Sequence, residues 1–200
     1  MVKTAHVYGN GPSRVLYNSH TPKDNELIVG CNLIEAGINP DIIAVIDSQP
    51  IAWMHDNNVY PTAKFWVSNR SMLQLRHYEM LDRIKVDKVW DDIHRYNCGI
   101  YAVRECLNQG YNVHMWGFDS MFSDSLESPA MDKIIPRHRR PKHLDSQWAT
   151  HWKKVFNDRK NKVWIHMFGD SNPKSHIQNN DTIKLVQHQE LSRNSYDAKQ

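Results

Sequence analysis

The residues best suited to chemistry follow short apolar runs, at four places along the chain. After the first run stand Gly9, Asn10, Gly11, Pro12 and Ser13; the later runs are followed by Cys31 and Asn32, by Asp47, and by Gly117, Phe118 and Asp119. Glycine lets a ligand approach the backbone closely, and N–H groups ahead of a helix can hold a phosphate. The pattern predicts a ligand-binding edge. The first segment also fits an ordinary strand-to-helix turn with a serine cap, and Asp119 also fits a cap for its own turn.

The apolar runs that position these residues predict strands. We expect strands at 4–8, 27–30, 41–46, 112–116 and 162–168, weaker ones at 64–67 and 88–90, and helices at 98–109 and 145–158. Strands that alternate with helices indicate an α/β fold, a single Rossmann-like domain with a mostly parallel sheet and helices on both faces. Ligands bind beyond the carboxyl ends of the strands in such sheets, where the polar residues fall.

Length and composition exclude several classes of protein. A chain of 200 residues suits one domain, and a formal net charge of +3 is too small for a dedicated nucleic-acid binder. The longest aliphatic run, Ile42–Ile46, is too short to span a membrane, and the first residues lack the apolar core of a signal peptide. The three cysteines do not have zinc-finger spacing, so we expect reduced thiols and a cytoplasmic protein.

Two segments depart from the alternating pattern. Residues 122–144 contain Pro129, Pro136 and Pro141 and no clear periodicity, which predicts a functional loop, a lid over the site. After the domain at 1–175, residues 176–200 are polar and predict a loosely held C-terminal tail. The lid carries a basic cluster that contains Arg137, His138, Arg139, Arg140, Lys142 and His143. Such a cluster fits a solvated loop, a nucleic-acid contact or a contact with the phosphate of a nucleotide.

In their order along the chain, these segments resemble the bacterial lipooligosaccharide sialyltransferases. Gly9–Ser13 resembles the opening motif of that family, and Ile28–Asn32 resembles its second strand, which ends in Cys-Asn. Arg95–Tyr101 is similar to its Arg-x-Thr-Ser-Gly-Val-Tyr segment, and Gly110-Tyr111 and Gly117–Asp119 are similar to its later glycine motifs. The resemblance covers about residues 3–175, and pterin diphosphokinase-like domains share its first and last signals.

The resemblance implies a GT-A-variant Rossmann-like domain with a lid that binds a cytidine-monophosphate sugar without a metal. It places Asn10, Gly11, Ser13 and Asn32 toward the donor, and Arg95 and Cys98 near it. With their neighbours, the expected nucleotide-binding residues are Gly9, Asn10, Gly11, Pro12, Ser13, Asn32, Asp47, Cys98, Gly99 and Asp119. His143 would take a proton from the acceptor hydroxyl, and an imidazole suits that task at neutral pH. His143 also fits an ordinary surface position, and His138 is the rival base.

Three differences from the family pattern bear on the donor. The family has two lid tyrosines shortly after its Gly-Ile-Asp motif, whereas Met121 and Phe122 stand here. Cys98 replaces a serine, and Asp47 stands near a family asparagine, where a carboxylate beside a phosphate is unfavourable without a cation or proton. Arg137, Arg139 and Arg140 could supply the missing positive charge instead.

We therefore expect a glycosyltransferase that uses a nucleotide-sugar donor and a glycan or other hydroxyl acceptor. The first alternative is a diphosphokinase-like transferase in which Asp47 and Asp119 hold Mg²⁺. The second is a protein that binds nucleotides or nucleic acid without catalysis. His6, His114 and His166 lie on expected strands without metal-site spacing, so we expect no resident metal. The oligomeric state is left open.

Overall fold

Eight strands form one sheet in the computed structural model, which describes residues 2–19, 23–32, 39–91, 96–121, 131, 134, 146–157, 160–172 and 177–192. The strands are β1 (Lys3–Tyr8), β2 (Leu27–Cys31), β3 (Ile42–Val45), β4 (Lys64–Ser68), β5 (Val86–Trp90), β6 (Tyr111–Trp116), β7 (Val163–Phe168) and β8 (Ile183–His188). Their order is β5-β4-β3-β2-β1-β6-β7-β8, and every neighbouring pair is parallel. The predicted α/β class with a parallel sheet is confirmed.

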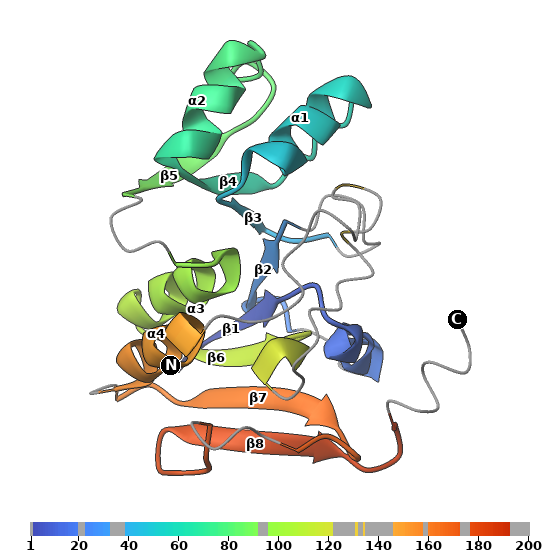
Figure 1. Ribbon diagram of the computed structural model, residues 1–200, viewed down its shortest axis with the longest axis vertical. Coiled ribbons are helices and arrows are strands. Elements are labelled where there is room, and N and C mark those ends of the chain that lie inside the picture. The colour runs from blue at the N-terminus through green and yellow to red at the C-terminus, as the bar shows by residue number, and fades with distance from the viewer. Residues whose placement is uncertain are drawn as a thin grey trace.

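Helices cover both faces of this sheet (Figure 1). They are η1 (Pro12–Ser19), α1 (Ser48–Asp56), α2 (Asn69–His77), α3 (Cys98–Asn108), the short η3 (Asp119–Met121) and α4 (Ser146–Phe156). Successive side chains of β3 point to opposite faces of the sheet. Ile42 and Ala44 pack into the core under α3 and α4. Ile43 and Val45 pack with α1 and α2 on the other face.

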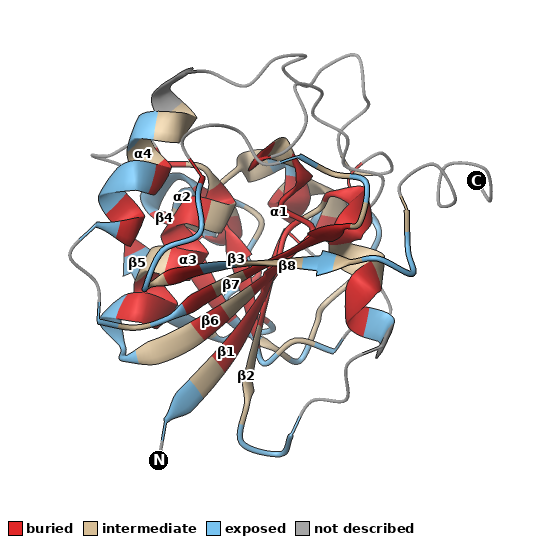
Figure 2. Cartoon of the chain, turned by 90° about the horizontal axis from the view of Figure 1, so that it is seen from below, coloured by how far each residue is buried: buried red, intermediate tan, exposed pale blue. Residues whose placement is uncertain are grey.

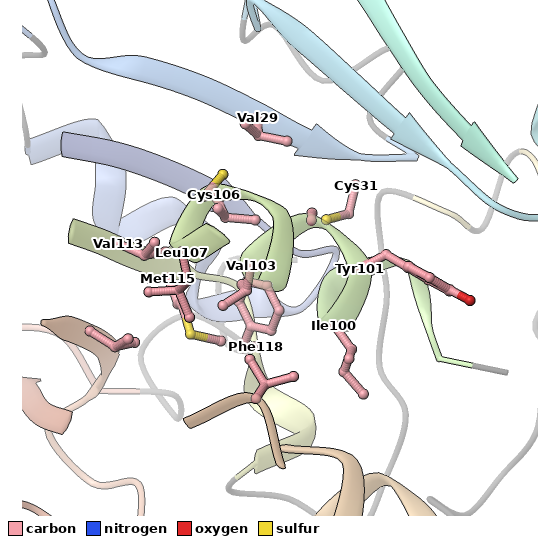
Figure 3. Packing of buried hydrophobic residues seen from close by; sticks show 14 of the residues in the cluster. Val29, Cys31, Ile100, Tyr101, Val103, Cys106, Leu107, Val113, Met115 and Phe118 are labelled. Atoms are coloured by element: carbon pink, nitrogen blue, oxygen red, sulfur yellow. The ribbon is translucent and has the colours of Figure 1, made fainter. Parts of the chain in front are cut away.

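The largest part of the core lies between α3, α4 and the central strands. Figure 3 shows Ile100, Val103 and Leu107 of α3 among side chains of β2 and β6. The apolar positions of α3 recur every three or four residues, and Gly110, with φ +84°, allows the turn that follows the helix. Buried residues run along the middle of the sheet in Figure 2.

The strand order reverses between β1 and β6. From β1 the chain builds outward through β2, β3, β4 and β5, and it then returns to place β6 on the other side of β1. The loop after β1 meets the loop after β6, and η1, which follows β1, packs on β6 and β7. Such a topological switch point is where open α/β sheets bind their ligands.

The prediction of a loosely held tail from residue 176 is wrong for residues 177–192. Ile183–His188 forms β8, which pairs with β7 along its whole length. Ile183 is buried and Lys184 and Gln187 are exposed, so the strand presents only part of its surface to the core. An edge strand of this kind has a weak apolar pattern, because one long side of it meets no other strand.

Most of the predicted lid lies outside the described residues. Within 122–144 the structure describes Met131, which is buried, and Ile134, whose N–H donates to the Met131 carbonyl. No helix of the described residues is long and apolar enough to cross a membrane.

Candidate functional site

The loops after β1 and β6 touch backbone to backbone. The Gly9 N–H donates to the Trp116 carbonyl at 2.7 Å, and the Gly11 N–H donates to the Gly117 carbonyl at 2.9 Å. A Cβ on Gly9 would lie 2.3 Å from the Gly117 oxygen, and Gly117 itself has φ +73°. Glycine at 9 and 117 is thus required by the contact between the two loops.

Asp119 fixes the start of η1 across this contact. One of its carboxylate oxygens accepts from the Ser13 N–H at 3.0 Å and from the Ser13 Oγ at 2.8 Å. Asp119 is 4% exposed, and a Cβ on Gly11 would lie 2.1 Å from the same oxygen. The carboxylate therefore caps the first turn of η1 at Ser13, 106 residues before it in the chain.

These contacts change the role of the Gly9–Ser13 loop. The N–H groups of Gly9, Gly11 and Ser13 donate to acceptors within the protein, and Pro12 has no N–H. In this conformation those three groups are committed to the protein, whereas the prediction assigned them to a phosphate. The loop acts here as the contact between the ends of β1 and β6, and its Asn10 side chain donates to the end of β2.

Asn10 and Asn32 supply two buried acceptors at the ends of β1 and β2. The Asn10 Nδ2 group donates to the Cys31 carbonyl at 2.8 Å, which leaves Oδ1 buried without a hydrogen-bond partner. Asn32 is 7% exposed with φ +54°, and its Oδ1 is likewise buried and unpartnered. Buried polar atoms are nearly always paired. Two orphaned oxygens on neighbouring strands therefore indicate a place for a ligand that donates hydrogen bonds.

Asp47 adds a carboxylate beside Asn32, at the end of β3. Burial raises the pKa of the Asp47 carboxyl, while the Arg70 guanidinium and a hydrogen bond from Asn32 oppose the rise. Asp47 is the N-cap residue of α1, yet its side chain makes no capping hydrogen bond. The carboxylate thus joins the two asparagines as a third acceptor group. Arg70, at the start of α2, is a neighbour that sequence reasoning missed.

The N-terminus of α3 completes the described part of the site. The Cys98 thiol donates to the Ala44 carbonyl at 3.0 Å, and this carbonyl also accepts from the Asn32 N–H at 2.8 Å. Burial raises the pKa of the Cys98 thiol well above its usual range, so the sulfur is a weak hydrogen-bond donor and not a nucleophile. A Cβ on Gly99 would lie 2.6 Å from the Phe118 ring, so that glycine serves packing.

Asn97 caps α3 and was also missed. Its Oδ1 accepts from the Ile100 N–H at 2.8 Å, the usual arrangement of an N-cap asparagine. The first N–H groups of a helix have no acceptors within it and carry a partial positive charge. In the sequence, an asparagine directly before apolar residues at helical spacing indicates a helix N-cap, and Asn97 has this position. The start of α3 is thus the described part of the site best suited to an anion.

The two carboxylates considered for Mg²⁺ are held apart. Asp47 follows β3, and Asp119 follows β6. In the sheet, β2 and β1 lie between these two strands. At roughly 4.8 Å per strand this separates them by about 14 Å, too far for one ion. Asp119 also accepts from both Ser13 donors. Among the residues described, no three His, Cys, Asp or Glu side chains converge as a metal site.

The other predicted site residues lie outside the described residues. They are Arg95, Arg137, Arg139, Arg140 and His143. The described site therefore combines Asn10, Asn32 and Asp47 from three neighbouring strand ends with Cys98 at the start of α3. Ser13 and Asp119 brace it from within and do not line it.

The fold is a Rossmann-like α/β domain with one parallel sheet. The chain is similar to the solved structure of the monofunctional alpha-2,3-sialyltransferase Cst-I from Campylobacter jejuni, with a TM-score of 0.53 and 14% identity over 82% of this chain and 75% of that one. It is also similar to an alpha-2,3-sialyltransferase from the same organism in apo form, with a TM-score of 0.50 and the same identity and coverage. No family model and no curated protein matches the chain.

These likenesses confirm the sialyltransferase-like fold that the sequence motifs predicted. At 14% identity they bear on the fold alone. The likeness to pterin diphosphokinase-like domains stays a prediction.

Proposed function

We propose that the protein is a glycosyltransferase that takes a nucleotide-activated sugar of the cytidine-monophosphate kind as donor. The observation that carries the proposal is the pair of buried, unpartnered oxygens, Asn10 Oδ1 and Asn32 Oδ1, at the carboxyl ends of β1 and β2. Their amide groups are oriented by hydrogen bonds to Cys31 and Asp47, so both present an acceptor. The ribose hydroxyls and the base amino group of a cytidine nucleotide are donors of the required kind.

The start of α3 supports the placement of the phosphate in this proposal. Its N–H groups and the helix dipole favour an anion. Asp47 opposes one, and its raised pKa and its neighbour Arg70 reduce that opposition. The nucleoside would thus contact the asparagines while its phosphate lies toward Cys98 and Gly99.

The proposed reaction transfers the sugar in one step. His143 accepts the proton of the acceptor hydroxyl, whose oxygen bonds to the anomeric carbon as the bond from that carbon to the phosphate oxygen breaks. The nucleoside monophosphate leaves with an added negative charge. Arg95 and the lid arginines Arg137, Arg139 and Arg140 stabilise that charge, in place of the absent lid tyrosines.

Nucleotide binding tests the site directly. Asn32→Gly removes the acceptor and keeps a residue that accepts positive φ. Asn58→Gly is the matched control, because Asn58 has φ +53° on an exposed turn. By calorimetry, we expect the affinity for cytidine monophosphate to fall roughly tenfold in Asn32→Gly and to stay unchanged in Asn58→Gly. Equal affinities in the two variants would contradict the site.

Transfer of sugar tests the chemistry. A general base contributes roughly 10²–10⁴-fold to the rate. We expect His143→Ala to lose that factor in kcat while it keeps the nucleotide affinity, and His138→Ala, from the same basic cluster, to stay near wild type. Loss of activity in His138→Ala alone would move the base to that residue. Nucleotide binding without transfer to any acceptor would favour the non-catalytic alternative.

A further inference from the structure

A row of histidines crosses the sheet on the face away from α3 and α4. His6 on β1, His114 on β6, His166 on β7 and His188 on β8 occupy consecutive strands, which lie side by side in Figure 1. His114 Nδ1 lies 2.9 Å from His166 Nε2, and His166 Nδ1 lies 2.9 Å from His188 Nε2. The last three rings therefore form one hydrogen-bonded chain, which we call the imidazole trio.

His6 stands next to the trio and does not extend it. The Trp116 indole N–H, which can only donate, points at His6 Nδ1 at 3.1 Å. His6 therefore accepts at Nδ1 and carries its proton at Nε2, which faces the Glu26 carboxylate at 3.1 Å. A second proton on His6 would oppose the indole N–H. His6 is thus held as one neutral tautomer, stacked on His114 at 5.0 Å between ring centroids.

The trio is arranged for a proton and not for a metal ion. His166 offers a different nitrogen to each neighbour, so the nitrogens run in a line across β6, β7 and β8. A zinc site needs ligands that converge on one point. None of the described residues forms such a group of three.

We propose that the imidazole trio is a one-proton binding site, in which His166 carries the proton and His114 and His188 both accept from it. In the neutral trio each short contact holds one N–H. A single added proton on an end ring also keeps both contacts, but the cation then donates to only one neighbour. On the middle ring the cation donates from both nitrogens to neutral neighbours. The two bonds become charge-assisted and stronger. Trp116 lies parallel to His166 at 3.5 Å between centroids, and an aromatic face favours a cation.

A second proton is excluded by the same geometry. On His114 or His188 it would put an N–H against an N–H of His166, and it would place two cations on rings about 5.2 Å apart between centroids. Burial lowers the pKa of His188, in keeping with a neutral ring at that end. Among the described residues, the other titratable or charged groups on this face of the sheet are His6, Tyr8, Arg14, Tyr17, Glu26 and Lys184, and Lys3 and Tyr111 lie on β1 and β6 at positions of the opposite face. The Glu26 carboxylate is bonded to His6.

Imidazole ¹⁵N spectra of the full chain between pH 8 and pH 4.5 test the proposal. We expect one ring of the trio to become a cation while the other two stay neutral, and the cation signal to disappear in His166→Gln. In His77→Gln, an exposed position on α2, the trio should titrate as in wild type. Three rings that titrate independently, no ring that titrates in the folded protein, or a first proton on His114 or His188 would each overturn the proposal.

A second variant keeps the test decisive if His166→Gln fails to fold. His188→Leu, on the edge strand, removes one acceptor, and we expect the proton affinity of His166 to fall roughly tenfold or more. An unchanged affinity would show that His188 takes no part. If Zn²⁺ changes all three ring signals at one equivalent, the trio is a metal site and the proposal is wrong.

Discussion

The Asp119 carboxylate accepts hydrogen bonds from both the backbone N–H and the hydroxyl of Ser13, although 106 residues separate them in the chain. This pair joins the β6 loop to the start of η1, and both residues are buried. The pair therefore holds the loops after β1 and β6 together.

Removal of the carboxylate should therefore destabilise the protein. Asp119→Ala leaves the N–H and the hydroxyl of Ser13 buried without their acceptor, and we expect the free energy of unfolding to fall by about 2 kcal/mol or more. Urea unfolding measures this loss. Asp24→Ala, at an exposed position, should change the value by about 0.5 kcal/mol at most. Equal stabilities of the two variants would show that the Ser13 pair contributes nothing.

A methyl group at Gly11 should act on the same pair. In Gly11→Ala the new Cβ would lie 2.1 Å from an Asp119 oxygen, so the carboxylate must move away from Ser13. We expect a lower melting temperature and a larger loss of stability than in Gly110→Ala. Gly110 has open space around its Cβ position, so the only cost in its variant is the strain of an alanine at φ +84°, about 1–2 kcal/mol. If Gly11→Ala melted at or above Gly110→Ala, the contact would be softer than the geometry indicates.

Glu105 should make the stability depend on pH in the acid range. The Glu105 carboxyl is desolvated by burial, but hydrogen bonds from Lys88 and Gln109 outweigh this and lower its pKa in the folded protein. Its contribution is therefore full above the unfolded pKa, near 4.3, and is lost as the pH falls through the lower folded value.

Glu105→Gln tests this dependence. We expect the variant to be less stable than wild type by about 1–2 kcal/mol at pH 7, and the difference to shrink as the pH falls below about 4. Chemical unfolding at several pH values gives both numbers. Glu190→Gln, at an exposed position, is the control and should follow wild type. A difference that stayed constant down to pH 2 would mean that the charge of Glu105 is not its source.

The three thiols should be unreactive in the native protein. Cys31, Cys98 and Cys106 are 2%, 7% and 0% exposed, and burial raises the pKa of Cys98 and Cys106. A chromogenic disulfide reagent at pH 8 should label none of them within minutes and all of them in denaturant. If the reagent labels Cys98 in the native state and a nucleotide protects it, the site opens more than this structure shows.

The strands of the fold could be predicted because each apolar run stops at a polar or glycine residue. Thr4–Tyr8 and Leu27–Gly30 differ from the observed strands by one residue at one end. The weaker strand predictions at 64–67 and 88–90 are confirmed, whereas α1 and β8 were missed for physical reasons: α1 buries only Pro50, Ile51 and Met54, and β8 is an edge strand. Their apolar stripes are narrow, and packing decides their structure more than local pattern does.

The candidate site was predictable in its positions and less so in its roles. Asn10, Asn32 and Asp47 do lie at neighbouring strand ends, because parallel strands bring their carboxyl ends to one edge. The internal use of the Gly11 and Ser13 N–H groups depends on a loop more than 100 residues later, which no local pattern reports. The two loops come together only because β1 and β6 pair in the folded sheet.

The place of β1 in the sheet sets an order for folding during synthesis. β1 precedes both of its neighbours, β2 and β6, in the chain, so its second long side stays uncovered until residues 111–116 leave the ribosome. The contact between the loops after β1 and β6 forms only when Gly117 and Asp119 follow. A growing chain shorter than this carries an open edge of β1, a surface that chaperones protect and that mispairs readily.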